Sequence, residues 1–95
     1  MEPIRELIAV DLEMTGLQVK TDQILEIGAV RLVDGQLRDT FQTFVNPHRR
    51  IDARITELTG IRSEMVEDAP EAEEALRKFL EFAGEAPFLG HNVIF

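Results

Sequence analysis

Cysteine, tryptophan and tyrosine are all absent from the sequence, and its six aromatic residues are all phenylalanine. The absence of cysteine excludes disulfide bonds, thiolate metal sites and a cysteine nucleophile. Any metal site must therefore be built from oxygen ligands and at most two imidazoles, those of His48 and His91.

Long apolar runs are absent as well. No run approaches the roughly 18 residues that a membrane-spanning helix needs. The first residues, Met-Glu-Pro-Ile-Arg-Glu, lack the apolar core of a signal peptide. We therefore expect a cytoplasmic protein that has no membrane partner.

Basic residues are few, because 10 Lys and Arg stand against 18 Asp and Glu, which gives a net charge of −8. A broad basic face that binds duplex nucleic acid is therefore not expected. An enzyme that contacts phosphates through metal ions remains compatible with this charge, because a bound cation inverts the local electrostatics. The length of 95 residues allows one domain with a small core.

Hydrophobic patterning predicts four strands. The second and third are joined by Asp34-Gly35, a pair typical of a two-residue hairpin turn. In the third strand we expect Leu37, Phe41 and Val45 to point inward, because they alternate with polar neighbours. The predicted strands cover residues 7–10, 24–33, 37–45 and 87–90.

One helix is predicted after the third strand, with Asp68 as its N-cap, Pro70 in its first turn and Gly84 at its end. Residues 48–67 are expected to be irregular, except for one helical turn over 55–58. The order strand–strand–strand–helix–strand indicates an α/β fold with a mixed sheet. The apolar face of the helix is predicted to consist of Ala72, Ala75, Leu76, Phe79, Leu80 and Ala83.

The candidate catalytic and metal-binding residues are Asp11 and Glu13, which follow the first apolar run. Positions i and i+2 of a strand point to the same face, so the two Cα atoms would lie roughly 6.5–7 Å apart. Two adjacent carboxylates raise each other's pKa, and Mg²⁺ or Mn²⁺ removes that repulsion. The alternative is that both are solvated side chains at a strand end.

Three residues that follow the acids suit the end of a nucleotide chain. Thr15 offers a hydroxyl group, Gly16 allows close approach of a ligand to the backbone, and Leu17 offers an apolar surface for a base.

These residues belong to a longer pattern that resembles the DEDD-type 3′–5′ exonucleases. Residues 10–17, Val-Asp-Leu-Glu-Met-Thr-Gly-Leu, are similar to the first motif of that family, which includes oligoribonuclease and the epsilon subunit of bacterial DNA polymerase III. Residues 22–30, 44–47 and 55–61 resemble the next landmarks of the epsilon-like group. Residues 90–95, Gly-His-Asn-Val-Ile-Phe, resemble the start of its second acidic motif.

The resemblance implies a ribonuclease H-like fold and two-metal hydrolysis of phosphodiesters at 3′ ends, with release of nucleoside 5′-monophosphates. It implies two Mg²⁺ or Mn²⁺ ions per complete site, with Asp11 bridging both ions and Glu13 binding one of them. The substrate would be a single-stranded DNA or RNA 3′ end, with DNA favoured, and a DNA polymerase is a candidate partner. The residues implied to contact substrate are Thr15, Gly16, Leu17, Thr59, His91, Asn92 and Phe95.

The family pattern also contains elements that this sequence lacks. The third metal ligand of the family is an Asp that follows the Phe matched by Phe95, and the catalytic His and fourth Asp belong to a later motif. We therefore expect residues 1–95 to form the N-terminal part of one exonuclease domain, incomplete as given and inactive alone. The alternative is a non-catalytic module that self-associates into a homo-oligomer through its uncovered apolar surface.

Three motifs are each compatible with two interpretations. His91-Asn92 is a helix cap or a substrate contact, and Thr59-Gly60 ends a helical turn or lies beside the terminal nucleotide. The basic cluster at residues 48–50, His-Arg-Arg, is a solvated loop or a phosphate contact.

Overall fold

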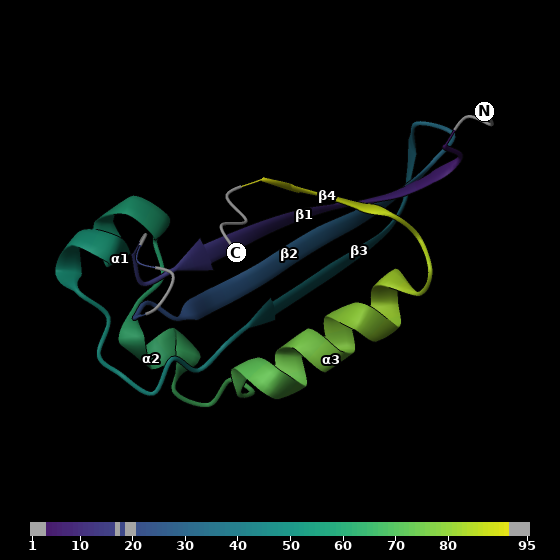
Figure 1. The fold of residues 1–95 in the computed structure, drawn as a ribbon. Coiled ribbons are helices and arrows are strands. Elements are labelled where there is room, and N and C mark those ends of the chain that lie inside the picture. Colours follow the sequence, from purple (N-terminus) through teal and green to yellow (C-terminus); the bar gives the residue numbers. More distant parts are fainter. Residues whose placement is uncertain (1–3, 17, 19–20, 92–95) are drawn as a thin grey trace.

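The computed structural model of the chain describes residues 4–16, 18 and 21–91. In these ranges it has four strands, arranged in the order β3-β2-β1-β4, and three helices (Figure 1). Strand β1 is antiparallel to β2 and parallel to β4, so the sheet is mixed, as predicted. The elements are β1 (Glu6–Met14), β2 (Ile24–Val33), β3 (Gln36–Phe44), α1 (Ala53–Thr59), α2 (Ser63–Val66), α3 (Ala72–Ala83) and β4 (Phe88–His91).

The β2–β3 hairpin forms at the predicted turn. Asp34 and Gly35 have φ angles of 52° and 79°, the two positive values that a tight hairpin turn of this kind requires. The Arg5 guanidinium lies 3.2 Å from the Asp34 carboxylate and ties the start of the chain to the turn. None of the described helices is long and apolar enough to cross a membrane.

Helix α3 covers one face of the sheet (Figure 1). Val10 and Leu12 of β1 are buried in a cluster with Ala75 and Phe79 of α3. The Phe79 ring packs edge-on against the ring of Phe41, with 6.1 Å between the ring centroids. Because side chains alternate along a strand, the residues of β1 between these core positions point to the opposite face.

A second cluster lies beside the first and involves α1 and α2. The pairing of β1 with β2 shifts after Glu13, and Leu25 is the residue of β2 that the shift leaves without a partner in β1. Leu25 is fully buried against Ile51, Ile61 and Val66. This irregularity therefore joins the end of the sheet to α1 and α2, which lie close to the end of β1 in Figure 1.

The helix predictions need two corrections. Helix α3 begins at Ala72 with Glu71 as its N-cap, rather than with Asp68 as cap, because the Ala69 N–H closes a turn onto the Val66 carbonyl of α2. Residues 48–67 are not irregular, since they contain α1 and α2. The predicted stop at Gly60 is confirmed, because its N–H donates to the Thr56 carbonyl at the end of α1.

Three predicted core residues are exposed, Leu37, Leu76 and Leu80, and Leu76 is the least exposed of them at 37%. Leu37 is 61% exposed, because it lies next to the hairpin turn, after a shift in the β2–β3 pairing. Leu80 is 57% exposed, because it lies about 100° around the helix from the buried Phe79. The buried face of α3 is therefore narrower than predicted.

Candidate active site

The two candidate metal ligands lie on β1, on the sheet face opposite α3. Asp11 is exposed and Glu13 is half-buried. Asp11 pairs with Gly28 of β2, and the absence of a side chain there leaves space beside the aspartate. Asp11 lines an open hollow of about 480 Å³ on this face, together with Ala9, Gly28, Val30 and Thr40.

The Glu13 carboxylate lies in an environment that disfavours its charged form. Its pKa is raised above the ordinary glutamate value, first by partial burial and then by the negative charges of Asp11 and Glu26. Glu26 is the direct cross-strand partner of Glu13. The Gln42 side-chain amide donates a 2.8 Å hydrogen bond to the Glu26 carboxylate and partly offsets the repulsion.

The electrostatics of the pair suit a cation. Asp11 and Glu13 supply hard oxygen ligands on neighbouring positions of one rigid strand. No group of three or more Asp, Glu or His side chains arranged to hold a metal ion is found among the described residues. The described part of the chain therefore contributes a pair of carboxylates rather than a closed cage.

The loop between β1 and β2 follows the acids directly. The Thr15 hydroxyl donates to the Asp22 carboxylate at 2.7 Å and accepts the Gln23 N–H at 2.9 Å. Gly16 lies so close to Asp22 that a Cβ atom added to it would be 2.5 Å from an Asp22 oxygen. Gly16 therefore has a steric role within the loop, and its predicted contact with a nucleotide stays a prediction.

The other predicted contact residues lie in two places. His91 ends β4 and pairs with Asp11 in the parallel register, so the fold brings the backbone of His91 next to that of the first acid. Thr59 lies at the end of α1, where its hydroxyl donates to the Ile55 carbonyl and accepts the Ile61 N–H. Leu17, Asn92 and Phe95 lie outside the described residues.

The residues of the basic cluster, 48–50, do not form one common site, because they contact different partners. His48 pairs with Glu71 at 3.1 Å, and Arg49 donates to the Thr21 carbonyl at 2.6 Å. Arg49 and Arg50 line a hollow of about 700 Å³ beside α1 and α2, together with the ion pair of Arg62 and Glu64. This hollow is larger than the one at Asp11, but Arg49 and Arg62 are paired with acids and neither candidate metal ligand lines it.

Two residues near the site, Glu26 and Asp22, were not predicted to have a role, and Arg49 was considered only as part of a solvated loop or a phosphate contact. Glu26 faces Glu13 only because of the β1–β2 register, which a long connecting loop leaves undetermined in the sequence. Asp22 and Arg49 interact across 27 positions of the sequence, a contact that no local pattern indicates. The one available signal was the short polar loop before β2, where an Asp typically bonds to backbone N–H groups.

The mixed sheet matches the architecture of solved nucleases. A structure described as Exonuclease X in complex with 5′ overhanging duplex DNA has a TM-score of 0.76 and 29% sequence identity, over 90% of this chain and 48% of that one. The nuclease domain of 3′hExo, described as a DEDDh family member bound to rAMP, has a TM-score of 0.78 and 23% identity, over 92% of this chain and 50% of that one. The fold is therefore that of the ribonuclease H-like exonucleases.

The sequence comparison identifies the family. A family model described as Exonuclease (RNase_T) matches residues 8–95, and the chain belongs to this family of 3′–5′ exonucleases. Two relatives are described as DNA polymerase III PolC-type, from Caldanaerobacter subterraneus subsp. tengcongensis with 51% identity and from Clostridium perfringens with 47% identity, each over 90 residues. The alignments cover 95% of this chain and 6% of each relative, so the chain spans a small part of their length.

Proposed function

We propose that the chain is part of a metal-dependent 3′–5′ exonuclease that removes nucleotides from the 3′ ends of single-stranded DNA. The observation that carries the proposal is the pairing of Asp11 and Glu13 on one open face of the sheet, where the pKa of Glu13 is raised by burial and by neighbouring acids. Two neighbouring carboxylates repel each other, and a bound cation stabilises the site by removing that repulsion.

The donor set fits Mg²⁺ or Mn²⁺. Mg²⁺ is commonly held by one or two protein carboxylates, with water and substrate phosphates completing its shell. Asp11 and Glu13 would hold the metal, with two ions in the complete site. When bound, such ions supply activation of a water molecule and charge stabilisation at the leaving oxygen of a phosphodiester.

The protein's own contribution is orientation. Strand β1 is paired on both sides, with β2 and with β4, so the two carboxylates have a fixed spacing and direction. Thr15 and Gly16 follow Glu13 after one residue, Met14, and would contact the terminal nucleotide, with Leu17 against its base. The contacts with the 3′ end would be completed by Thr59, His91, Asn92 and Phe95.

The substrate and the extent of the domain are part of the proposal. DNA is favoured over RNA because relatives with 51% and 47% identity are described as DNA polymerases, and the same names support a polymerase as partner. Residues 1–95 would form the N-terminal part of one exonuclease domain, since they cover about half of the solved nuclease chains. The 95 residues alone would then be inactive, and we place the protein in the cytoplasm.

The test is a nuclease assay on the full-length protein that carries these residues. With Mg²⁺ and a single-stranded DNA oligonucleotide labelled at its 5′ end, we expect products shortened one nucleotide at a time from the 3′ end. Asp11→Asn should lower kcat more than about 100-fold, because loss of outer-shell partners of a metal already costs about 10–100-fold.

A matched control is Asp39→Asn on β3, which removes the same charge at an exposed position; within the described part of the chain, the only hydrogen bond of this carboxylate is from the adjacent Thr40 N–H. This variant should retain wild-type activity. Full activity in Asp11→Asn, or cleavage from the 5′ end in the wild-type protein, would refute the proposal.

A further inference from the structure

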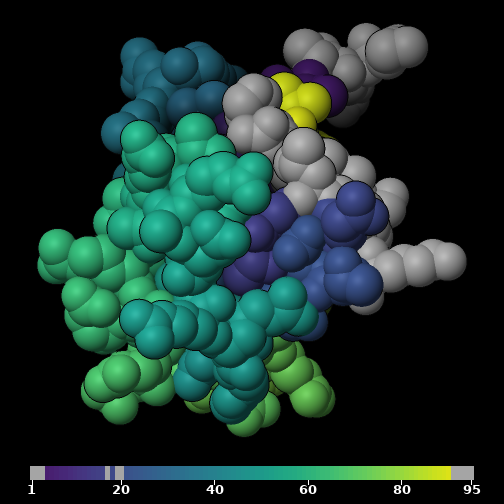
Figure 2. Space-filling model, turned by 90° about the vertical axis from the view of Figure 1, so that its left-hand side faces the viewer, coloured from purple at the N-terminus to yellow at the C-terminus, as the bar shows by residue number. Residues whose placement is uncertain are grey.

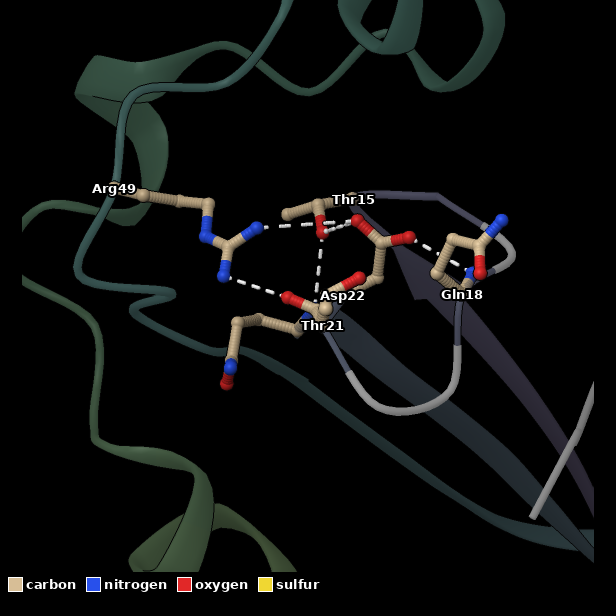
Figure 3. A network of polar contacts seen from close by, with 6 residues as sticks. Thr15, Gln18, Thr21, Asp22 and Arg49 are labelled. Carbon is tan, nitrogen blue, oxygen red and sulfur yellow. Dashed lines mark hydrogen bonds and ion pairs between the residues drawn. The ribbon is translucent and has the colours of Figure 1, made fainter.

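The loop between β1 and β2 is organised around one carboxylate. Asp22 accepts hydrogen bonds on both of its oxygens, from the Thr15 hydroxyl at 2.7 Å and from the Gln18 backbone N–H at 2.8 Å (Figure 3). The Asp22 N–H in turn donates to the Gln18 carbonyl at 2.7 Å. Asp22 therefore fixes the loop at its start and in its middle.

The same carboxylate packs directly against Gly16. A Cβ atom on Gly16 would lie 2.5 Å from one Asp22 oxygen and 2.9 Å from the carboxylate carbon, closer than real Cβ atoms come. The carboxylate and the glycine backbone are thus fitted to each other, and the position of one determines the position of the other.

A second segment holds the loop from outside. Arg49, in the segment that follows β3, donates to the Thr21 carbonyl at 2.6 Å, and its guanidinium lies 3.9 Å from the Asp22 carboxylate (Figure 3). Figure 2 shows the blue β1–β2 connection and the teal segment around α1 side by side at this end of the molecule. The Asp22 side chain is only 15% exposed as a result.

We propose that Asp22 is a positioning residue of the nucleotide site: its carboxylate sets the backbone around Thr15 and Gly16, and Arg49 anchors the same loop to the segment after β3. This inference rests on the proposed exonuclease function and adds a residue that would contact neither metal nor substrate. The ionised carboxylate is required, because an amide has only one acceptor oxygen for two donors. In agreement, the pKa of Asp22 is lowered, first by the Thr15 hydroxyl and then by the Gln18 N–H.

The first test measures the loop itself. Amide hydrogen exchange of Gln18 and Gln23 is followed by NMR in the 95-residue chain and in Asp22→Asn. At least one of the two amides should exchange about tenfold faster in the variant, because the single amide oxygen replaces only one of two hydrogen bonds to a charged acceptor: loss of the first exposes the Gln18 N–H, and loss of the second frees the Thr15 hydroxyl that accepts the Gln23 N–H. Asp39→Asn should leave both amides unchanged, and unchanged exchange of both Gln18 and Gln23 in Asp22→Asn overturns the proposal.

The second test measures the consequence for substrate in the full-length protein. Asp22→Asn should raise KM for a single-stranded oligonucleotide about tenfold and leave kcat within about twofold, because binding is disturbed while the metal ligands stay in place. A purely structural role would instead reduce the active fraction, which lowers the apparent kcat and leaves KM unchanged.

The two proposals fail in different ways. If the wild-type protein degrades 3′ ends and Asp22→Asn has an unchanged KM, the positioning role is overturned and the exonuclease function stands. If the wild-type protein has no 3′–5′ activity, the exonuclease function is overturned, and Asp22 is then a structural residue only.

Discussion

At the scale of single residues, Glu13 carries a charge in an unfavourable place. Its carboxylate is half-buried, lies directly opposite Glu26 on the neighbouring strand and is close enough to Asp11 to be affected by its charge. Like charges opposite each other in a sheet destabilise the pairing by up to about 1 kcal/mol. Such an arrangement is understandable where function needs the charge, because the clustered negative charges become favourable when a cation is bound beside them.

This cost gives a prediction for the metal-free chain. Glu13→Gln should raise the free energy of unfolding at pH 7 by up to about 1 kcal/mol, measured by urea denaturation with EDTA present. Because burial and the neighbouring acids raise the pKa of Glu13 in the folded state, its charge destabilises the fold only as pH rises through that pKa. The gain should therefore shrink toward about pH 4, and a gain that grows on acidification would contradict the interpretation.

At the scale of secondary structure, local signals predicted the elements better than their packing. The hairpin at Asp34-Gly35 and the helix ends at Gly60 and Gly84 were predicted correctly, because turn and cap geometry depends on a few adjacent residues. The burial of Leu37, Leu76 and Leu80 was predicted wrongly, because exposure depends on how far α3 and the sheet overlap in space.

The difference between two neighbouring residues of α3 provides a test of this packing. Phe79→Ala should lower the free energy of unfolding by about 3–5 kcal/mol, since Phe79 is buried against Phe41 and Phe88. Leu80→Ala should lower it by less than about 1 kcal/mol, because this side chain is 57% exposed. Equal losses in urea denaturation would contradict the observed orientation of the helix.

The candidate site was predictable in part for the same reason. Asp11 and Glu13 are two residues apart on one strand, so their common face follows from the sequence alone. Glu26 joins them through strand register, and Asp22 and Arg49 meet through a long-range contact. These partners became visible only in the three-dimensional structure.

At the scale of the whole molecule, the two faces of the sheet have different roles. One face packs against α3 and carries the larger apolar cluster, and the other carries the carboxylates. Helices α1 and α2 lie near the end of β1, and Arg49 connects the segment before them to the loop that follows the acids (Figure 1). The fold thus separates the residues that hold it together from those proposed to bind metal and nucleotide.

The proposed binding of a divalent cation by Asp11 and Glu13 can be measured by a Mn²⁺ titration of the chain followed by NMR. Because Mn²⁺ is paramagnetic, we expect it to broaden first the backbone signals of β1 around Asp11 and Glu13 and those of β2 around Gly28. Asp11→Asn should weaken this binding by at least about tenfold, and Asp39→Asn should not. Broadening that spares β1, or equal Mn²⁺ affinity in Asp11→Asn, would contradict cation binding by these two carboxylates.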